Sequence, residues 1–150
     1  MNCTFAGNQA QEGAAIYREL KQQDDLSVAL ACLALSACEA GEALEAREHL
    51  CLAFEAAAGS GAVVPLLWAL PAVALLLAGE GEAERAVELY ALASRYALVA
   101  RSRWFADVVG DRIAGAAAAL PADRVALLKE RGQARDLQAT AADLLAELRG

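Results

Sequence analysis

Three residues that favour turns stand 40 positions apart in this chain of 150 residues: Gly41, Gly81 and Pro121. Each comes shortly before acidic residues, and acidic side chains in a first helical turn oppose the positive end of the helix dipole. Proline suits the first position of a helix, because its missing N–H would lack an intrahelical partner there. The spacing therefore predicts three helix starts in equivalent places, and with them a structural repeat of 40 residues.

Matching residues flank the three breaks. Upstream, a large residue is followed by alanine in each repeat, at Leu33–Ala34, Val73–Ala74 and Ile113–Ala114. Downstream, alanine recurs at positions 46, 86 and 126. Small residues at a helix crossing allow the close approach that an antiparallel pair requires. We therefore predict helix pairs at 25–57, 62–97 and 101–131, preceded by a half repeat at 8–23 and followed by a closing helix at 136–149.

The composition also favours helices. The chain is 58% hydrophobic and only 5% aromatic, and alanine and leucine dominate it. These two residues lead the intrinsic helix scale, whereas the β-branched and aromatic residues typical of strands are scarce. We expect a single all-α domain over residues 1–150, a right-handed superhelical α-solenoid of about seven helices.

The two ends of this array differ. The closing helix is either capped by Asp136 or started by the capping-box pattern Thr140 to Asp143, and its polar residues suit an end unit that faces water. In contrast, nothing in residues 1–7 would cover the free side of the first helix. We expect either that the array continues before residue 1 or that the chain associates with itself there.

Two segments resemble the second-helix half of a tetratricopeptide repeat: GEALEAREHLCLAF at 41–54 and GEAERAVELYALA at 81–93. The small pair Ala46/Ala53, repeated as Ala86/Ala93, is the most specific part of the pattern. The 40-residue unit is similar to the long-helix variety in large bacterial signal-transduction ATPases and maltose-activator-type transcriptional regulators. Segments 89–96, 101–105 and 134–148 resemble the C-terminal tails of such proteins. The resemblance implies a non-catalytic protein-interaction or sensor module, without the ATPase or DNA-binding portions.

Tetratricopeptide geometry would place the first helix of each pair on a concave face that binds a peptide, a partner domain or a small effector. The resemblance puts seven interaction residues there: Val28, Leu35, Trp68, Pro71, Leu75, Val108 and Asp111. This set lacks the Lys, Arg and Asn clamp with which the peptide-carboxylate-binding members of that family hold a peptide C-terminus. Trp68 is open to two interpretations, a core aromatic or an anchor in the groove. Pro71 falls inside a predicted helix, where it removes a hydrogen bond and favours a bend.

Basic and aromatic residues concentrate in one stretch only, at Arg95, Arg101, Arg103 and Trp104. An arginine stacked on tryptophan is able to hold a phosphate or an acidic partner. Alternatively, these arginines bridge to acids of the adjoining helix. Both interpretations remain open at the level of the sequence.

The net charge of −7 is unevenly distributed. Residues 1–84 carry 12 acidic and 3 basic residues, whereas residues 85–150 carry 8 acidic and 10 basic residues. The acidic balance argues against a nucleic-acid partner, because neutralising phosphates requires a surplus of Lys and Arg on one face. The polarity suggests an alternative function, self-association of the acidic N-terminal end with the basic C-terminal end of another copy.

Catalytic and metal-binding patterns are missing from the sequence. The cysteines, at positions 3, 32, 38 and 51, form no C-x-x-C pair, and His49 is the only histidine. We interpret the cysteines as reduced residues of a cytoplasmic protein and expect no metal, no cofactor and no catalytic residue. Gly59-Ser60-Gly61 is not followed by the G-K-[ST] of a phosphate loop.

The charge-free stretch at 56–79 raises the question of a membrane span. We expect none, because the stretch contains Pro65 and Pro71 and is flanked by acids. A helix that is apolar all round is instead expected inside a helical array, where neighbours cover each side.

Overall fold

The computed structural model describes the backbone of residues 3–150 and the side chains of residues 11–150. Within these residues the chain forms helices and connecting turns and no strand, as the composition predicts. The helices are α1 (Cys3–Glu39), α2 (Ala43–Ser60), α3 (Val63–Gly79), α4 (Ala83–Ser94), α5 (Ala97–Ala100), α6 (Arg103–Phe105), the π-helical segment η1 (Ala106–Gly110), α7 (Asp111–Ala117), α8 (Ala122–Ala134) and α9 (Leu137–Arg149).

The first two predicted turns are nearly identical. Gly41 and Gly81 have φ angles of +77° and +84°, in the left-handed region that glycine adopts without strain. The amide of Glu42 donates to the carbonyl of Ala37 at 2.8 Å, and that of Glu82 to the carbonyl of Leu77 at 2.9 Å. These bonds close α1 and α3 in the same manner. The 40-residue spacing is therefore present in the backbone geometry of the first two hairpins.

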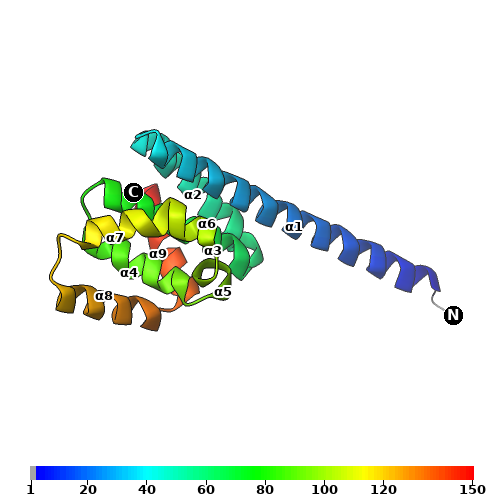
Figure 1. Cartoon of the computed structure of the whole chain (residues 1–150). Coiled ribbons are helices and arrows are strands. Elements are labelled where there is room, and N and C mark those ends of the chain that lie inside the picture. The colour runs from blue at the N-terminus through cyan, green and yellow to red at the C-terminus, as the bar shows by residue number, and fades with distance from the viewer. Residues whose placement is uncertain (1–2) are drawn as a thin grey trace.

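Helix α1 corrects the predicted start of the array. The half repeat at 8–23 and the helix from residue 25 form one helix of 37 residues, with no break between them. No glycine or proline lies between Gly13 and Gly41, and the glutamines at positions 22 and 23 are good helix formers. The N-terminal half of α1 extends away from the other helices (Figure 1), and the side chains of residues 11–23 are exposed.

Helix α3 lies at the centre of the molecule. It contacts α1, α2, α4, α7, η1 and α9, and the whole stretch from Ala69 to Leu77 is buried. This confirms the expectation that the charge-free helix is covered by its neighbours. Among the described residues, no helix is both long enough and apolar enough to cross a membrane.

The third helix pair departs from the first two. The first helix of the pair predicted at 101–131 consists of α6, η1 and α7. Its second helix, α8, packs mainly against α4 and has little direct contact with α7. The alanines matched between repeats reflect this difference. Ala34, Ala74, Ala46 and Ala86 are fully buried, whereas Ala114 and Ala126 are exposed.

The position matched at Leu33, Val73 and Ile113 also differs between repeats. Val73 and Ile113 are 3% and 5% exposed, but Leu33 is 51% exposed. Val73 belongs to the central helix α3, and Ile113 belongs to α7, which packs against α3 and α4, whereas Leu33 lies on a side of α1 that is open to solvent. The sequence match between these three positions therefore does not extend to their environments, because Leu33 is exposed.

Helix α9 does not simply follow the third pair. It packs against α2 and α3, which precede it by more than 50 residues in the sequence. The side chain of Gln138 donates to the carbonyl of Gly61 at 3.1 Å. The side chain of Asp136 caps it by accepting from the amide of Ala139 at 2.7 Å, which decides between the two predicted start signals. Strict solenoids pack each unit only on its neighbours, so this contact departs from that pattern.

Ion pairs join the acidic and basic parts of the chain within one molecule. Arg149 of α9 lies 3.1 Å from Glu55 of α2, and Arg124 of α8 lies 2.9 Å from Glu84 of α4. Part of the uneven charge is therefore neutralised inside the fold.

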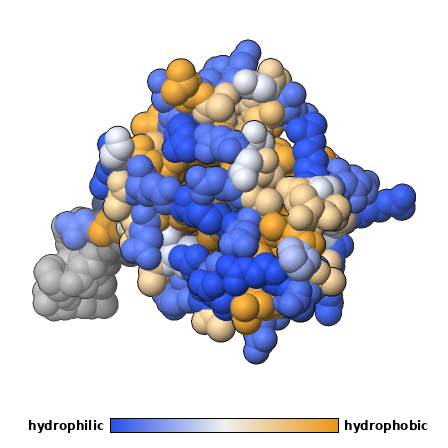
Figure 2. Space-filling view, turned by 90° about the vertical axis from the view of Figure 1, so that its left-hand side faces the viewer, coloured by the Kyte–Doolittle hydropathy of each residue, from blue (hydrophilic) through white to orange (hydrophobic). Residues whose placement is uncertain are grey.

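The side of the molecule turned away from the projecting half of α1 is largely polar, with apolar residues in small patches (Figure 2).

Candidate functional site: a groove between α1 and α3

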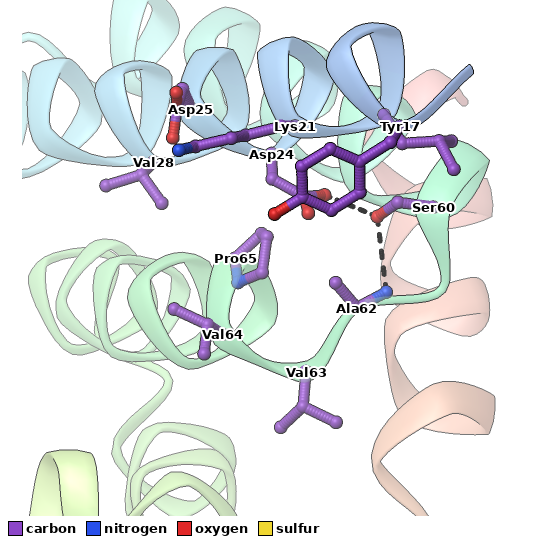
Figure 3. A pocket seen from close by; sticks show the side chains of 11 residues that line it. Tyr17, Lys21, Asp24, Asp25, Val28, Ser60, Ala62, Val63, Val64 and Pro65 are labelled. Carbon is purple, nitrogen blue, oxygen red and sulfur yellow. Dashed lines mark hydrogen bonds between the residues drawn. The ribbon is translucent and has the colours of Figure 1, made fainter. Parts of the chain in front are cut away.

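A groove of about 480 Å³ separates the middle of α1 from the start of α3. One wall is α1, from Tyr17 to Val28, and the other comprises the α2–α3 turn and the first turn of α3 (Figure 3). Its lining residues are Tyr17, Leu20, Lys21, Asp24, Asp25, Val28, Ser60, Ala62, Val63, Val64 and Pro65. One wall is thus helical throughout, and the other consists of a short turn and the helix that follows it.

A hydrogen-bonded turn holds the two walls together at one end. The hydroxyl of Ser60 donates to the carboxylate of Asp24 on α1 and accepts from the amide of Ala62 at 3.2 Å (Figure 3). Gly61 has a φ angle of +67°, which lets the chain reverse from α2 into α3. These contacts tie the start of α3 to the side of α1 and set the width of the groove.

The groove is lined by exposed apolar side chains. Tyr17 is 67% exposed, Leu20 38%, Val63 41% and Val64 50%. Tyr17 projects from α1 towards the α2–α3 turn, across the gap from Val63 (Figure 3). Scattered exposed apolar residues are normal on protein surfaces, but a group on two facing walls is typical of an interaction site.

An aromatic cluster extends this apolar surface along α3. The ring of Trp68 lies 5.7 Å from that of Trp104 and 5.0 Å from that of Phe105, measured between centroids. Trp68 follows Val64 by four residues and so shares its side of the helix. Phe105 is buried, whereas Trp104 is 48% exposed. The exposed surface therefore continues from the groove to Trp104.

The predicted concave-face residues divide into two groups. Val28 lines the groove, Trp68 belongs to the aromatic cluster, Val108 is half-buried and Asp111 is exposed. Leu35, Pro71 and Leu75 are instead buried in the core. The prediction that these three line an open surface is wrong, because α1 and α3 pack against each other along this part of their length.

The predicted basic patch also separates. Arg95 donates to the carbonyl of Gln133 at 2.8 Å and to the hydroxyl of Tyr96 at 2.9 Å, so it holds the end of α8. Arg103 lies 3.8 Å from Asp107 on the following turn. Arg101 and Trp104 are exposed. Neither predicted role, an anion site or bridges to acids of the adjoining helix, describes Arg95.

The three cysteines with described side chains have raised pKa values, chiefly because of burial. Cys32, Cys38 and Cys51 are free, and the side chain of Cys3 lies outside the described residues. Burial raises the pKa of the Cys38 thiol to about 11, so it is protonated at neutral pH. In the part of the chain with described side chains, no group of three His, Cys, Asp or Glu residues is placed to hold a metal ion.

Tyr17, Leu20, Val63 and Val64 were not predicted as site residues. A signal for the first two exists, because they belong to one apolar stripe of the first predicted helix. Because α1 continues beyond the core as one helix, this apolar stripe is exposed.

Comparison of the chain with protein-family models, with curated proteins and with solved structures finds no match.

Proposed function

We propose that this chain is a non-catalytic protein-interaction module whose α1–α3 groove receives the apolar face of an amphipathic helix. The helix would belong to a peptide or to a partner domain. The observation that carries the proposal is the group of exposed apolar side chains on the two facing walls, Tyr17 and Leu20 on one and Val63 and Val64 on the other. Grooves of this kind recognise helices through anchors spaced at i, i+3, i+4 and i+7.

The charge around the groove favours a basic partner. Asp24 and Asp25 line it, and Glu12 and Glu19 lie on the adjoining, projecting half of α1. The bases of this stretch, residues 12–25, are Arg18 and Lys21. An amphipathic helix with lysines beside its apolar stripe would complement this balance. Complementary charge increases the rate of encounter and disfavours acidic competitors.

The tetratricopeptide-like interpretation remains part of the proposal. The identical turns at Gly41 and Gly81 support two equivalent hairpins, and we propose that they are units of a curved α-solenoid against which α9 folds back. On this basis the module would serve a cytoplasmic bacterial signalling ATPase or transcriptional regulator. The ligand would then lie beside the predicted concave face, near Val28 and Trp68, and outside the core formed by Leu35, Pro71 and Leu75.

A labelled model peptide tests the groove. The probe is a fluorescein-labelled helix of about four turns, with leucines at i, i+3, i+4 and i+7 and lysines on both flanks, followed by fluorescence anisotropy. We expect saturable binding, weakened about tenfold by Leu20→Ser and by Val64→Ser, because each variant removes apolar area from the contact. The matched control is Leu44→Ser, since Leu44 is 79% exposed on α2, outside the groove.

The outcomes are distinct. Equal effects of Leu20→Ser and Leu44→Ser would show that the peptide does not bind in the groove. Failure of the peptide to bind at about 100 µM would contradict a helix-receiving groove of this chemistry. A peptide with glutamates in place of the lysines is expected to bind more weakly than the basic probe.

Self-association is the second candidate function, and the exposed apolar face of α1 favours it. In this form, a second copy would cover Ile16, Tyr17 and Leu20, of which the first two are more than half exposed. Light scattering across a salt series separates the routes. Association through oppositely charged ends weakens at high ionic strength, whereas association through the apolar face does not.

A further inference from the structure

A second cavity lies between α4, α7 and α8, where the two helices of the third predicted pair are separated from each other. Its volume is about 290 Å³. Gly110, Ile113, Ala114 and Ala117 form one wall, and these residues follow the i, i+3, i+4, i+7 pattern of a single helix face. Lys129 and Gln133, one turn apart on α8, stand at the opposite wall, and α4 forms the floor. We call this cavity the third-pair cleft.

The 40-residue repeat shows what opens this cleft. In the second pair, the positions that correspond to 110, 117 and 129 are occupied by Leu70, Leu77 and Leu89, all buried where α3 packs on α4. In the third pair, glycine and alanine replace the first two leucines, and lysine replaces the third. The chain thus places small residues and a charge where the preceding repeat is filled with leucine.

The backbone keeps α8 away from α7. Gly132 lies so close to α4 that a β-carbon there would stand 2.1 Å from the carbonyl oxygen of Glu88. This close approach packs α8 against α4. On the other side of the cleft, η1 inserts a π-helical turn just before α7, and such turns occur frequently at functional sites.

Hydrogen-bond donors collect around the apolar walls. The Tyr90 hydroxyl reaches the wall beside Gly110, where a β-carbon would stand only 3.1 Å from it. Burial raises the pKa of Tyr90, so its hydroxyl stays protonated at neutral pH and is able to donate. Ser94 and Gln133 add polar groups, and Lys129 is the only charged residue of the lining.

We propose that the third-pair cleft binds a small carboxylic acid with an aliphatic body, whose carboxylate lies beside Lys129 and whose body contacts Ile113, Ala114 and Ala117. The cleft volume equals that of about ten water molecules, which matches a ligand of about ten non-hydrogen atoms. Its apolar walls favour a hydrocarbon chain, and the single cation and the donors favour an anionic head. This site is separate from the α1–α3 groove and does not depend on it.

Octanoate is the probe, because it has about ten non-hydrogen atoms. Isothermal titration calorimetry on the full chain is expected to give a dissociation constant on the order of 0.1 mM. Ala117→Leu restores the leucine of the second repeat and fills the cleft, so it should weaken octanoate at least about tenfold while raising the melting temperature. Lys129→Gln should weaken octanoate about fivefold and leave the binding of neutral 1-octanol unchanged.

The control for the lysine is Lys21→Gln, since Lys21 is the only other lysine and lines the α1–α3 groove. It should bind octanoate like the unaltered chain. Undiminished binding to folded Ala117→Leu, or equal effects of the two lysine variants, would overturn the proposal. So would the absence of saturable binding up to about 10 mM. If Ala117→Leu does not fold, the comparison of Lys129→Gln with Lys21→Gln decides, because both side chains are exposed.

Discussion

At the scale of single residues, glycine has opposite effects at different places in this chain. Gly41 and Gly81 occupy left-handed backbone, where a β-carbon would collide with the following carbonyl group. Gly59 lies inside the last turn of α2, and a β-carbon there would have no atom of another helix within 4 Å. In a helix, glycine is less favourable than alanine because it loses more conformational freedom on folding.

Alanine substitutions should therefore change the free energy of unfolding in opposite directions. We expect Gly81→Ala to lower it by about 1 kcal/mol, and Gly59→Ala to leave it unchanged or raise it by up to about 1 kcal/mol. Urea denaturation followed by circular dichroism measures both. Equal loss of stability in the two variants would contradict the assignment of Gly81 as the residue that requires a positive φ angle.

The sequence carried enough information for these turns because their requirement is local. A glycine after an apolar helix and before acidic residues is sufficient to predict both, and the bonds from Glu42 and Glu82 confirm them. The environment of Leu33 could not be predicted in this way. The exposure of Leu33 depends on whether another helix covers α1, and no residue near position 33 indicates whether one does.

At the scale of helices, most elements follow the predicted pattern, and the exceptions have long-range causes. Helices α2, α3 and α4 lie where the repeat places them. The first two predicted helices form one helix, α1, because no glycine or proline separates them. The repeat pattern predicts a boundary there, but no residue enforces it. The position of α9 depends on contacts with α2 and α4 that no local sequence pattern encodes.

The approach of α8 to α4 yields a second prediction, based on Gly132. A β-carbon at this position would overlap the carbonyl oxygen of Glu88, whereas one at Gly115 of α7 would meet nothing within 4 Å. We expect Gly132→Ala to lower the free energy of unfolding by about 2 to 4 kcal/mol, because backbone has to move, and Gly115→Ala to be neutral or stabilising. Thermal denaturation of both variants measures this. A Gly132→Ala variant as stable as Gly115→Ala would show that α8 is not held closely against α4.

At the scale of the whole molecule, arginine–carboxylate pairs connect helices that are far apart in sequence. Glu147 of α9 pairs with Arg85 of α4 at 2.6 Å, through two hydrogen bonds. Arg149 on the same helix pairs with Glu55 of α2. These contacts hold α9 against the first two hairpins, and residues that the sequence placed on a solvated outer face therefore have structural partners. None of these paired residues lines the candidate groove, which lies along α1 from Tyr17 to Val28.

Acid should weaken the attachment of α9. The hydrogen bonds from Arg85 lower the pKa of Glu147 in the folded chain, so its stabilising effect is complete above the unfolded value of about 4.3 and is lost as the pH falls through the lower folded value. At pH 7 we expect Glu147→Gln to be less stable by at most about 1 kcal/mol, because the pair is half exposed and solvent screens it. Melting temperatures between about pH 7 and 3 should show this difference shrinking as Glu147 of the unaltered chain becomes protonated. Asp143→Asn is the control, since Asp143 is exposed on α9 and forms no ion pair with the described side chains. A difference that persists at the lowest pH would show that Glu147 acts through packing instead of charge.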